Sequence, residues 1–228
     1  MRHPSFIKEK TVGEFFLKLA FFLVSLLLMA FGTALMACAE LGLDSEELVI
    51  FGFKNLLGIG SEWQAIALFD GVFFLLLLAF FRKPIYFGMF IHILCFDPLI
   101  QLFEGWMEHF IPKEHPLWLG ILISMLGVAV FGVAISFALS ANFGLGIYDG
   151  VVMWVSHQLH ISHMVGFWIV NALFVLLGFL FGGRINVQIG ITTLLFGLFV
   201  GVVHAVSFDW VEHLAEKMHV KKLKKAVC

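Results

Sequence analysis

The chain has 228 residues, of which 61% are hydrophobic and 13% are charged, and its formal net charge at pH 7 is −2. Soluble proteins average about 45–50% apolar and about 25% charged residues, so this composition excludes an ordinary soluble domain. The small negative net charge also argues against a nucleic-acid partner. With a mean hydropathy of +1.01, the sequence predicts an all-α, polytopic membrane protein in contact with membrane lipid.

Six apolar stretches are long enough to cross a bilayer, for which a helix needs about 20 residues. Three of them lie in each half of the chain. In chain order the stretches cover residues 15–39, 63–81, 84–103, 117–141, 164–183 and 185–208.

A shorter apolar segment follows the first span of each half, at residues 45–58 and at residues 147–161. Both are too short to cross a bilayer fully and are candidates for re-entrant or half helices. Asp44 and Glu47 have the spacing of a capping box, and Asp149 stands at the position equivalent to Glu47. These acids either cap the short helices or face a cavity, and the sequence leaves both interpretations open.

Short glycine motifs occur twice, at an offset of about one hundred residues, which is longer than the period of solenoid repeats. The pairs are Phe31-Gly32-x-Ala34 with Phe131-Gly132-x-Ala134, Leu41-Gly42-Leu43 with Phe143-Gly144-Leu145, and Gly88 with Gly190. We therefore predict two copies of one multi-helix unit. The chain then divides into an N-terminal segment 1–14, a first repeat 15–110, a linker 111–116, a second repeat 117–214 and a basic tail 215–228.

The distribution of Lys and Arg predicts the orientation, because cytoplasmic loops are enriched in both residues. If the short segments are re-entrant, most positive charge falls on the cytoplasmic side, and only Lys113 and Arg184 lie outside. If the short segments cross instead, Arg82 and Lys83 move outside, which is less favourable. The re-entrant arrangement gives each half three crossings and relates the halves by an inverted pseudo-two-fold axis. Both termini are then cytoplasmic.

Ionisable side chains inside apolar spans are expensive and are functional candidates by default. Asp70 lies within one residue of the position equivalent to Asn171, so both halves place a polar group at a similar depth. This pair either forms interhelical hydrogen bonds or lines a solute path. Asp97 precedes Pro98, which favours a kink with a locally satisfied carboxyl group.

The sequence contains no nucleophile elbow, phosphate loop, zinc signature or haem motif, so we expect neither an enzyme nor a bound metal or cofactor. His157, His160 and His163 have a spacing that could suit a metal, but the first half has no equivalent histidines. A solvated helix end is the favoured interpretation. The three cysteines show no paired spacing, so we expect no disulfide.

Two glycine-rich segments of the second half are Phe131-Gly132-Val133-Ala134 and Asn142-Phe143-Gly144-Leu145-Gly146-Ile147-Tyr148-Asp149-Gly150. With Gly32-Thr33-Ala34-Leu35 and Glu40-Leu41-Gly42-Leu43 of the first half, they resemble the signature of the YczE/YyaS-like bacterial integral membrane proteins. The resemblance implies a small multi-pass protein of the bacterial inner membrane, from a family largely without an assigned function and often described as transporters. The family's usual Gly-Pro before the short helix is replaced here by Asp44-Ser45 and Gly146-Ile147.

These observations lead to two hypotheses of different classes. The first is a secondary transporter or channel for a small cationic, zwitterionic or proton-coupled solute, which binds between the two repeats. In it, Glu47 and Asp149 bind the solute or ion, while Asp70 and Asn171 line its path. The alternative is a non-transporting membrane protein that supports another complex, and either protein could form a homo-oligomer.

Overall fold

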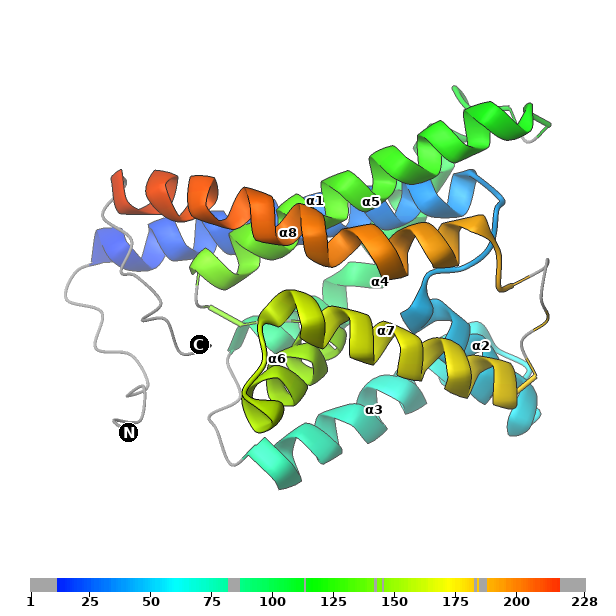
Figure 1. The fold of residues 1–228 in the computed structure, drawn as a ribbon, viewed down its shortest axis with the longest axis horizontal. Coiled ribbons are helices and arrows are strands. Elements are labelled where there is room, and N and C mark those ends of the chain that lie inside the picture. The colour runs from blue at the N-terminus through cyan, green and yellow to red at the C-terminus, as the bar shows by residue number, and fades with distance from the viewer. Residues whose placement is uncertain are drawn as a thin grey trace.

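The computed structural model describes residues 12–81, 87–112, 114–141, 143–144, 146–182, 184 and 188–217. These residues form eight α-helices and no strand, so the all-α prediction is confirmed (Figure 1). The helices are α1 (Val12–Cys38), α2 (Ser45–Leu56), α3 (Glu62–Phe81), α4 (Phe87–Met107), α5 (Leu117–Ala141), α6 (Ile147–Leu159), α7 (His163–Leu180) and α8 (Ile191–Lys217).

Each half of the chain has the same order of helices, which is one long, one short and two long. The short helices α2 and α6 have 12 and 13 residues and match the two predicted short segments. Both end at a left-handed residue at equivalent positions, Gly58 (φ 64°) and His160 (φ 55°). A left-handed residue ends a helix because the next amides can no longer follow the helical ladder.

Five helices of the described residues are long and apolar enough to cross a membrane, the pattern of a multi-pass membrane protein. They are Phe15–Cys38 in α1, Gly88–Met107 in α4, Leu117–Ala141 in α5, His163–Leu180 in α7 and Ile191–Ala215 in α8. The sixth predicted span, residues 63–81, forms α3, which has 20 residues. At 1.5 Å per residue this helix is about 30 Å long, which is close to the thickness of the hydrocarbon layer.

Helix α8 begins at Ile191, six residues later than predicted, because a loop of the first half binds the preceding backbone. The Leu43 N–H donates to the Gln188 carbonyl oxygen at 2.8 Å, and the Thr192 N–H donates to the Leu41 carbonyl oxygen at 3.1 Å. These bonds occupy groups that an earlier helical turn would need. A contact between the two halves therefore sets this helix boundary.

The helices form two layers (Figure 1). One layer contains α1, α4, α5 and α8, in which α1 packs on both α4 and α5, and α5 packs on α8. The other layer contains α2, α3, α6 and α7. The two layers meet where α7 packs on α8 of the first layer. Helices α1 and α5 run antiparallel, since Gly32 lies beside Gly127 while Ala39 lies beside Gly120.

The packing of the first half is matched in the second. The α1·α4 contact corresponds to α5·α8, α2·α7 corresponds to α3·α6, and α2·α3 corresponds to α6·α7. Helices α1 and α4 run parallel, with Phe22 beside Gly88 and Phe31 beside Phe103. Helices α5 and α8 also run parallel. The match is incomplete, because α7 packs on α8 much more extensively than α3 packs on α4. Helix α4 is consequently the least buried of the five spans.

Glycines allow α1 and α5 to approach closely at the centre of the first layer. A Cβ atom at Gly32 would lie 2.8 Å from the Gly127 carbonyl oxygen, and one at Gly127 would lie 2.7 Å from the Gly32 carbonyl oxygen. Gly132 likewise lies against Val203 of α8. The prediction that Gly32 and Gly132 mark close helix packing is confirmed.

Candidate functional site

Each short helix begins beside a point where its preceding loop packs, backbone against backbone, on the other half of the chain. We call these two points the glycine crossings. In the first, Gly42 (φ 110°) lies on Gly190, and a Cβ atom at Gly42 would come 2.6 Å from the Gly190 nitrogen. In the second, Gly144 (φ 149°) lies on Gly88, whose N–H donates to the Phe143 carbonyl oxygen at 3.2 Å. Positive φ and backbone contact together require glycine. The paired glycines of the sequence thus serve equivalent crossings.

Asp44 caps the N-terminus of α2. Its buried carboxylate accepts hydrogen bonds from the N–H groups of Glu46 at 2.9 Å and Glu47 at 3.0 Å. Burial raises the pKa of Asp44 to about 6, although the two hydrogen bonds lower it. The cap therefore places a carboxyl group that can take up a proton at the start of α2.

The first residue of α2 is hydrogen-bonded to the second half of the chain. The buried Ser45 hydroxyl donates to Asn171 Oδ1 of α7 at 2.6 Å. The Asn171 amide nitrogen in turn donates to the Phe167 carbonyl oxygen at 2.9 Å. Asn171 thus forms an interhelical hydrogen bond, one of the two roles that the sequence left open, and its partner is Ser45.

Four carboxylates lie close enough to Glu46, in the first turn of α2, to act on it electrostatically. We call the following five side chains the acidic cluster: the N-cap Asp44 and Glu46 of α2, Asp70 of α3, Asp97 of α4 and Asp149 of α6. Burial raises the pKa of Glu46 well above its usual range, and the charges of the other four raise it further. The cluster joins the two halves, because α2, α3 and α4 belong to the first and α6 to the second.

Asp149 is a buried member of the acidic cluster with one oxygen atom that no described residue binds. Its side chain is 3% exposed, and its Oδ1 atom has no hydrogen-bond partner among the described residues. Burial raises the pKa of Asp149, which lies in the first turn of α6, from its ordinary 3.8 to about 7. The N-cap of this helix is Gly146, which supplies no side-chain hydrogen bond. A buried acceptor thus remains available to a ligand.

Tyr148 adds a second buried polar group beside Asp149. The side chain is 3% exposed, and its hydroxyl interacts with the Ser45 side chain as a hydrogen-bond partner. The phenol group lies near Ser45 and near the carboxylates of Asp44, Glu46 and Asp149. Its hydroxyl therefore faces the acidic cluster.

His92 of α4 closes the site at the start of α6. A Cβ atom at Gly146 would lie 2.9 Å from His92 Nε2, so the imidazole packs directly on the backbone there. The ring stacks on Phe96, with the centroids 4.4 Å apart. Helix α4 continues through Pro98 in the turn that carries Asp97.

The structure brings together three of the four residues expected at the site. Asp70 and Asp149 belong to the acidic cluster, and Asn171 is bonded to Ser45 next to it. The fourth residue, Glu47, contacts the site through its backbone N–H, which donates to Asp44. It is the side chain of its neighbour Glu46 on which the other carboxylates of the cluster act. Adjacent helical positions diverge by about 100°, so the Glu47 side chain points in a different direction from that of Glu46.

Sequence reasoning missed Ser45, Glu46 and Tyr148. Glu46 and Tyr148 are equivalent positions of the two short helices, each one residue before the acids compared in the sequence. Their equivalent positions could have indicated a shared place at the site, although one residue is an acid and the other a phenol. Only the packing of α2 on α7 shows which residues of its first turn face the interior.

The histidines considered for metal binding are separated in the structure. The rings of His157 and His160 lie 6.5 Å apart, whereas His163 lies beside His204 of α8, with 5.1 Å between ring centroids. The His204 Nδ1 atom is 2.9 Å from the Ser136 hydroxyl. No three His, Cys, Asp or Glu residues within the described ranges are placed to hold a metal ion.

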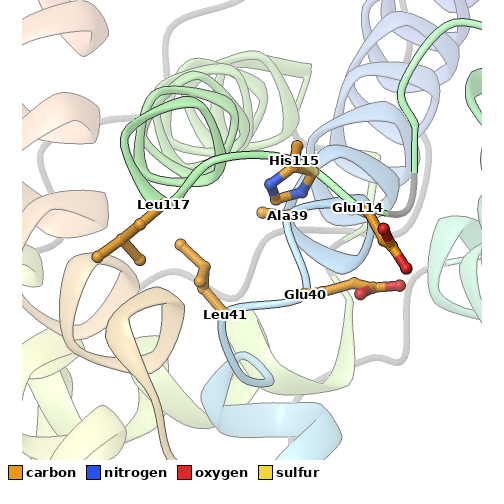
Figure 2. Close-up of a pocket in the computed structure, with 6 residues that line it drawn as sticks. All are labelled: Ala39, Glu40, Leu41, Glu114, His115 and Leu117. Carbon is orange, nitrogen blue, oxygen red and sulfur yellow. The ribbon is translucent and has the colours of Figure 1, made fainter.

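A separate pocket of about 560 Å³ opens where α1 ends and α5 begins (Figure 2). Glu40 and Glu114 point to the same side of it, and the His115 ring faces it. His115 is held by a 3.3 Å contact between its Nε2 atom and the Cys38 carbonyl oxygen. Both glutamates are exposed, so water satisfies them without a ligand. The acidic cluster is therefore the stronger candidate for a functional site.

Comparison with known proteins places the chain in a family. No curated protein and no solved structure matches it. Residues 16–208, which run from Phe16 in α1 to Phe208 in α8, match a family of unknown function. The chain therefore belongs to this family of unknown function, DUF6198.

Proposed function

We propose that this protein is a secondary transporter or channel for a small cationic, zwitterionic or proton-coupled solute, which binds at the acidic cluster between the two halves. The observation that carries the proposal is the Asp149 carboxylate, which is 3% exposed, keeps an unbonded oxygen and lies among other carboxylates. A buried carboxylate in such surroundings is expensive unless a proton or a cation offsets its charge.

The directions of the helices support an inverted-repeat transporter. Since α1 and α4 run parallel and both are long enough to span, only one of α2 and α3 crosses the membrane between them. Helix α2, with 12 residues, is about 18 Å long and is the better candidate for a re-entrant helix. Since α1 and α5 are antiparallel, the second half has the opposite orientation, as in inverted repeats that bind solutes at their interface.

The proposal extends to residue roles and location. Asp149 and Glu46 bind the cation, Asp70 lines its path, and Asn171 fixes α2 through Ser45. Glu47, which is equivalent to Asp149 in the sequence, is the alternative to Glu46 as the cation ligand of α2. The YczE/YyaS-like glycine motifs and the lysine distribution support a bacterial inner-membrane protein with cytoplasmic termini.

The test of this function is solute-dependent stabilisation of the purified protein, followed by uptake into liposomes. A ligand stabilises the folded form by mass action. We expect a cation from a panel of amines, amino acids and metal ions to raise the melting temperature, and Asp149→Asn to abolish both this effect and uptake. Asp209→Asn, at an exposed residue of α8, is the matched control. Uptake that is undiminished in Asp149→Asn would refute the assignment.

A specific observation favours the non-transporting alternative as a second candidate. The least buried span, α4, exposes Leu94 and Leu102 at 73% and 64%, and Gln101 is exposed between them. An amide in a lipid-facing position gains from a hydrogen bond to another helix. This candidate predicts that a complex extracted in mild detergent is lost in Gln101→Leu. A monomer without a co-purifying protein would count against it.

A further inference from the structure

The negative charge of the acidic cluster is spread over several helices and is not focused on one point. Its five carboxylates come from α2, α3, α4 and α6, and all the other four act on Glu46. Among the described residues, no three acidic, His or Cys side chains surround a common point in the manner of a metal site. Spread charge of this kind is complementary to a ligand whose own positive charges are separated.

An unsatisfied acceptor and a buried hydroxyl lie within this spread charge. Asp149 Oδ1 is buried and has no hydrogen-bond partner within the described residues, and the buried Tyr148 hydroxyl, which interacts with the Ser45 side chain, lies close to it. An ammonium group carries three N–H donors and no acceptor, so it can bond to a carboxylate and a hydroxyl oxygen together. Buried polar groups of a folded protein are normally paired, so Asp149 Oδ1 together with the nearby hydroxyl oxygen suits such a donor.

Aromatic rings lie near members of the acidic cluster in the sequence and pack on one another. Phe73, one helical turn after Asp70, lies 5.6 Å from Phe174, which in turn lies 5.5 Å from Tyr148. Phe96, next to Asp97, is half-buried and stacks on His92. Apolar surface near carboxylates suits methylene groups, and aromatic faces attract ammonium groups.

We propose that the acidic cluster binds a linear organic cation with two or more ammonium groups joined by methylene chains. One ammonium group bonds to Asp149 and Tyr148 of α6. A second ammonium group pairs with the carboxylates that α2, α3 and α4 contribute. This inference rests on the proposed function, since it names the chemical class of the solute that the same site takes.

The test measures binding to the full-length protein in detergent by calorimetry and by melting temperature. The probes are spermidine and 1,4-diaminobutane, with n-butylamine as the singly charged match and Mg²⁺ as a compact divalent match. We expect spermidine and 1,4-diaminobutane to bind at least about ten times more tightly than n-butylamine, and Mg²⁺ to have no effect that depends on Asp149.

Variants locate the binding. Asp149→Asn and Glu46→Gln should each weaken the binding of 1,4-diaminobutane about tenfold or more, whereas Asp209→Asn should not change it. Asp70→Asn provides an independent variant if Asp149→Asn does not yield a monodisperse protein. Each variant is compared with the unmodified chain for helical content by circular dichroism.

Different outcomes overturn the inference and the proposed function. Equal binding of n-butylamine and 1,4-diaminobutane, or an equal Asp149-dependent effect of Mg²⁺, would overturn the separated-charge ligand and leave the cation site intact. Diamine binding that is unchanged in Asp149→Asn, Glu46→Gln and Asp70→Asn would place it outside the cluster and overturn the inference. If no cation in the wider panel binds in an Asp149-dependent way, the proposed function falls as well.

Discussion

At the scale of single residues, Asp149 is a buried side chain that lowers the stability of the fold. Its carboxylate is buried and one of its oxygens has no hydrogen bond within the described residues. An unsatisfied buried polar group costs about 1–3 kcal/mol. The N-terminus of α6 offsets part of this cost, because the helix dipole favours negative charge there. Binding of a cation would offset the remainder.

The raised pKa of Asp149 predicts that stability falls as pH rises. The unfolded chain loses this proton near pH 3.8 and the folded chain near pH 7, so the folded state binds more protons between these values. Stability therefore decreases from about pH 4 to about pH 7 and then levels off. Asp44 and Glu46 have raised pKa values and contribute in the same direction. Asp70, Asp97, His92 and Tyr148 are the other titratable groups at the site.

Asp149→Asn should reduce this dependence. We expect the variant to be more stable than the unmodified protein by about 1 kcal/mol or more at pH 8, which raises the melting temperature by about 2–4 °C. The difference should disappear near pH 4. Thermal unfolding in detergent at a series of pH values measures it, with Asp209→Asn as the control. Parallel curves for Asp149→Asn and the unmodified protein would show that Asp149 titrates normally.

The hydrogen bond from Ser45 to Asn171 should couple the two halves energetically. Ser45→Ala leaves the buried Asn171 Oδ1 without this donor, so we expect a loss of about 1–3 kcal/mol in unfolding free energy. A double-mutant cycle with Asn171→Ala should give an interaction energy of about 0.5–3 kcal/mol. Additive effects of the two substitutions would show that the bond contributes nothing to stability.

At the scale of elements, two glycine crossings fix where the short helices begin. Gly42 rests on Gly190, and Gly144 rests on Gly88, so each loop is held by the start of a long helix from the other half. Because these contacts are between backbones, they fix the direction of α2 and α6 more tightly than side-chain packing would. The acidic cluster depends on this placement, since it includes Glu46 of α2 and Asp149 of α6.

Alanine at the first crossing should be much more damaging than alanine at a glycine of the same backbone geometry. Gly42 and Gly182 both have φ 110°, but nothing lies within 4 Å of a Cβ atom at Gly182. We expect Gly182→Ala to cost about 1–3 kcal/mol from backbone strain. Gly42→Ala should cost more than about 4 kcal/mol, because the backbone of Gly190 must also move. Equal melting temperatures of the two variants would contradict the crossing.

The two adjacent glutamates of α2 offer a second test at this scale. Glu46→Gln should weaken cation binding about tenfold, because its carboxylate lies among the other members of the acidic cluster. Glu47→Gln should change binding by less than about twofold, since neighbouring helical positions point about 100° apart. Calorimetric titration of the two variants measures both values. The reverse order of effects would favour the repeat-derived assignment of Glu47.

For the whole molecule, the two layers and their opposite chain directions imply a specific topology. In Figure 1 the α2–α3 turn lies towards the right and the α6–α7 turn towards the left of the layer that α2, α3, α6 and α7 form, although the two turns are equivalent in the two halves. An inverted arrangement with re-entrant short helices puts these turns on opposite sides of the membrane. If both short helices crossed, the two turns would lie on the same side.

Cysteine labelling distinguishes these topologies. Asn55 and Gln158 are exposed residues near the ends of α2 and α6, so Asn55→Cys and Gln158→Cys report on the two turns. In a background without the three native cysteines, we expect an impermeant maleimide to label Asn55→Cys from outside the cell. Gln158→Cys should react only after the membrane is opened. Labelling of both positions from the same side would exclude the inverted arrangement.

Apolar length and helix-end signals in the sequence determined the class of the protein and the positions of its helices. Two short segments were recognisable because they lack the residues needed to cross hydrocarbon, and Asp44 was recognisable as a cap. The glycine pairs were visible too, but their role was not, since the sequence cannot show that Gly42 lies on Gly190.

Only the tertiary structure decided which side chains meet. It placed Glu46 in the acidic cluster and paired Asn171 with Ser45, because the rotation of α2 about its axis is set by its packing on α7. It also moved the start of α8 to Ile191, because backbone bonds to the first half compete with the helical ladder there. The sequence pattern within one helix shows where that helix lies along the chain. A site built from four helices depends on contacts between residues far apart in the sequence, which such a pattern does not contain.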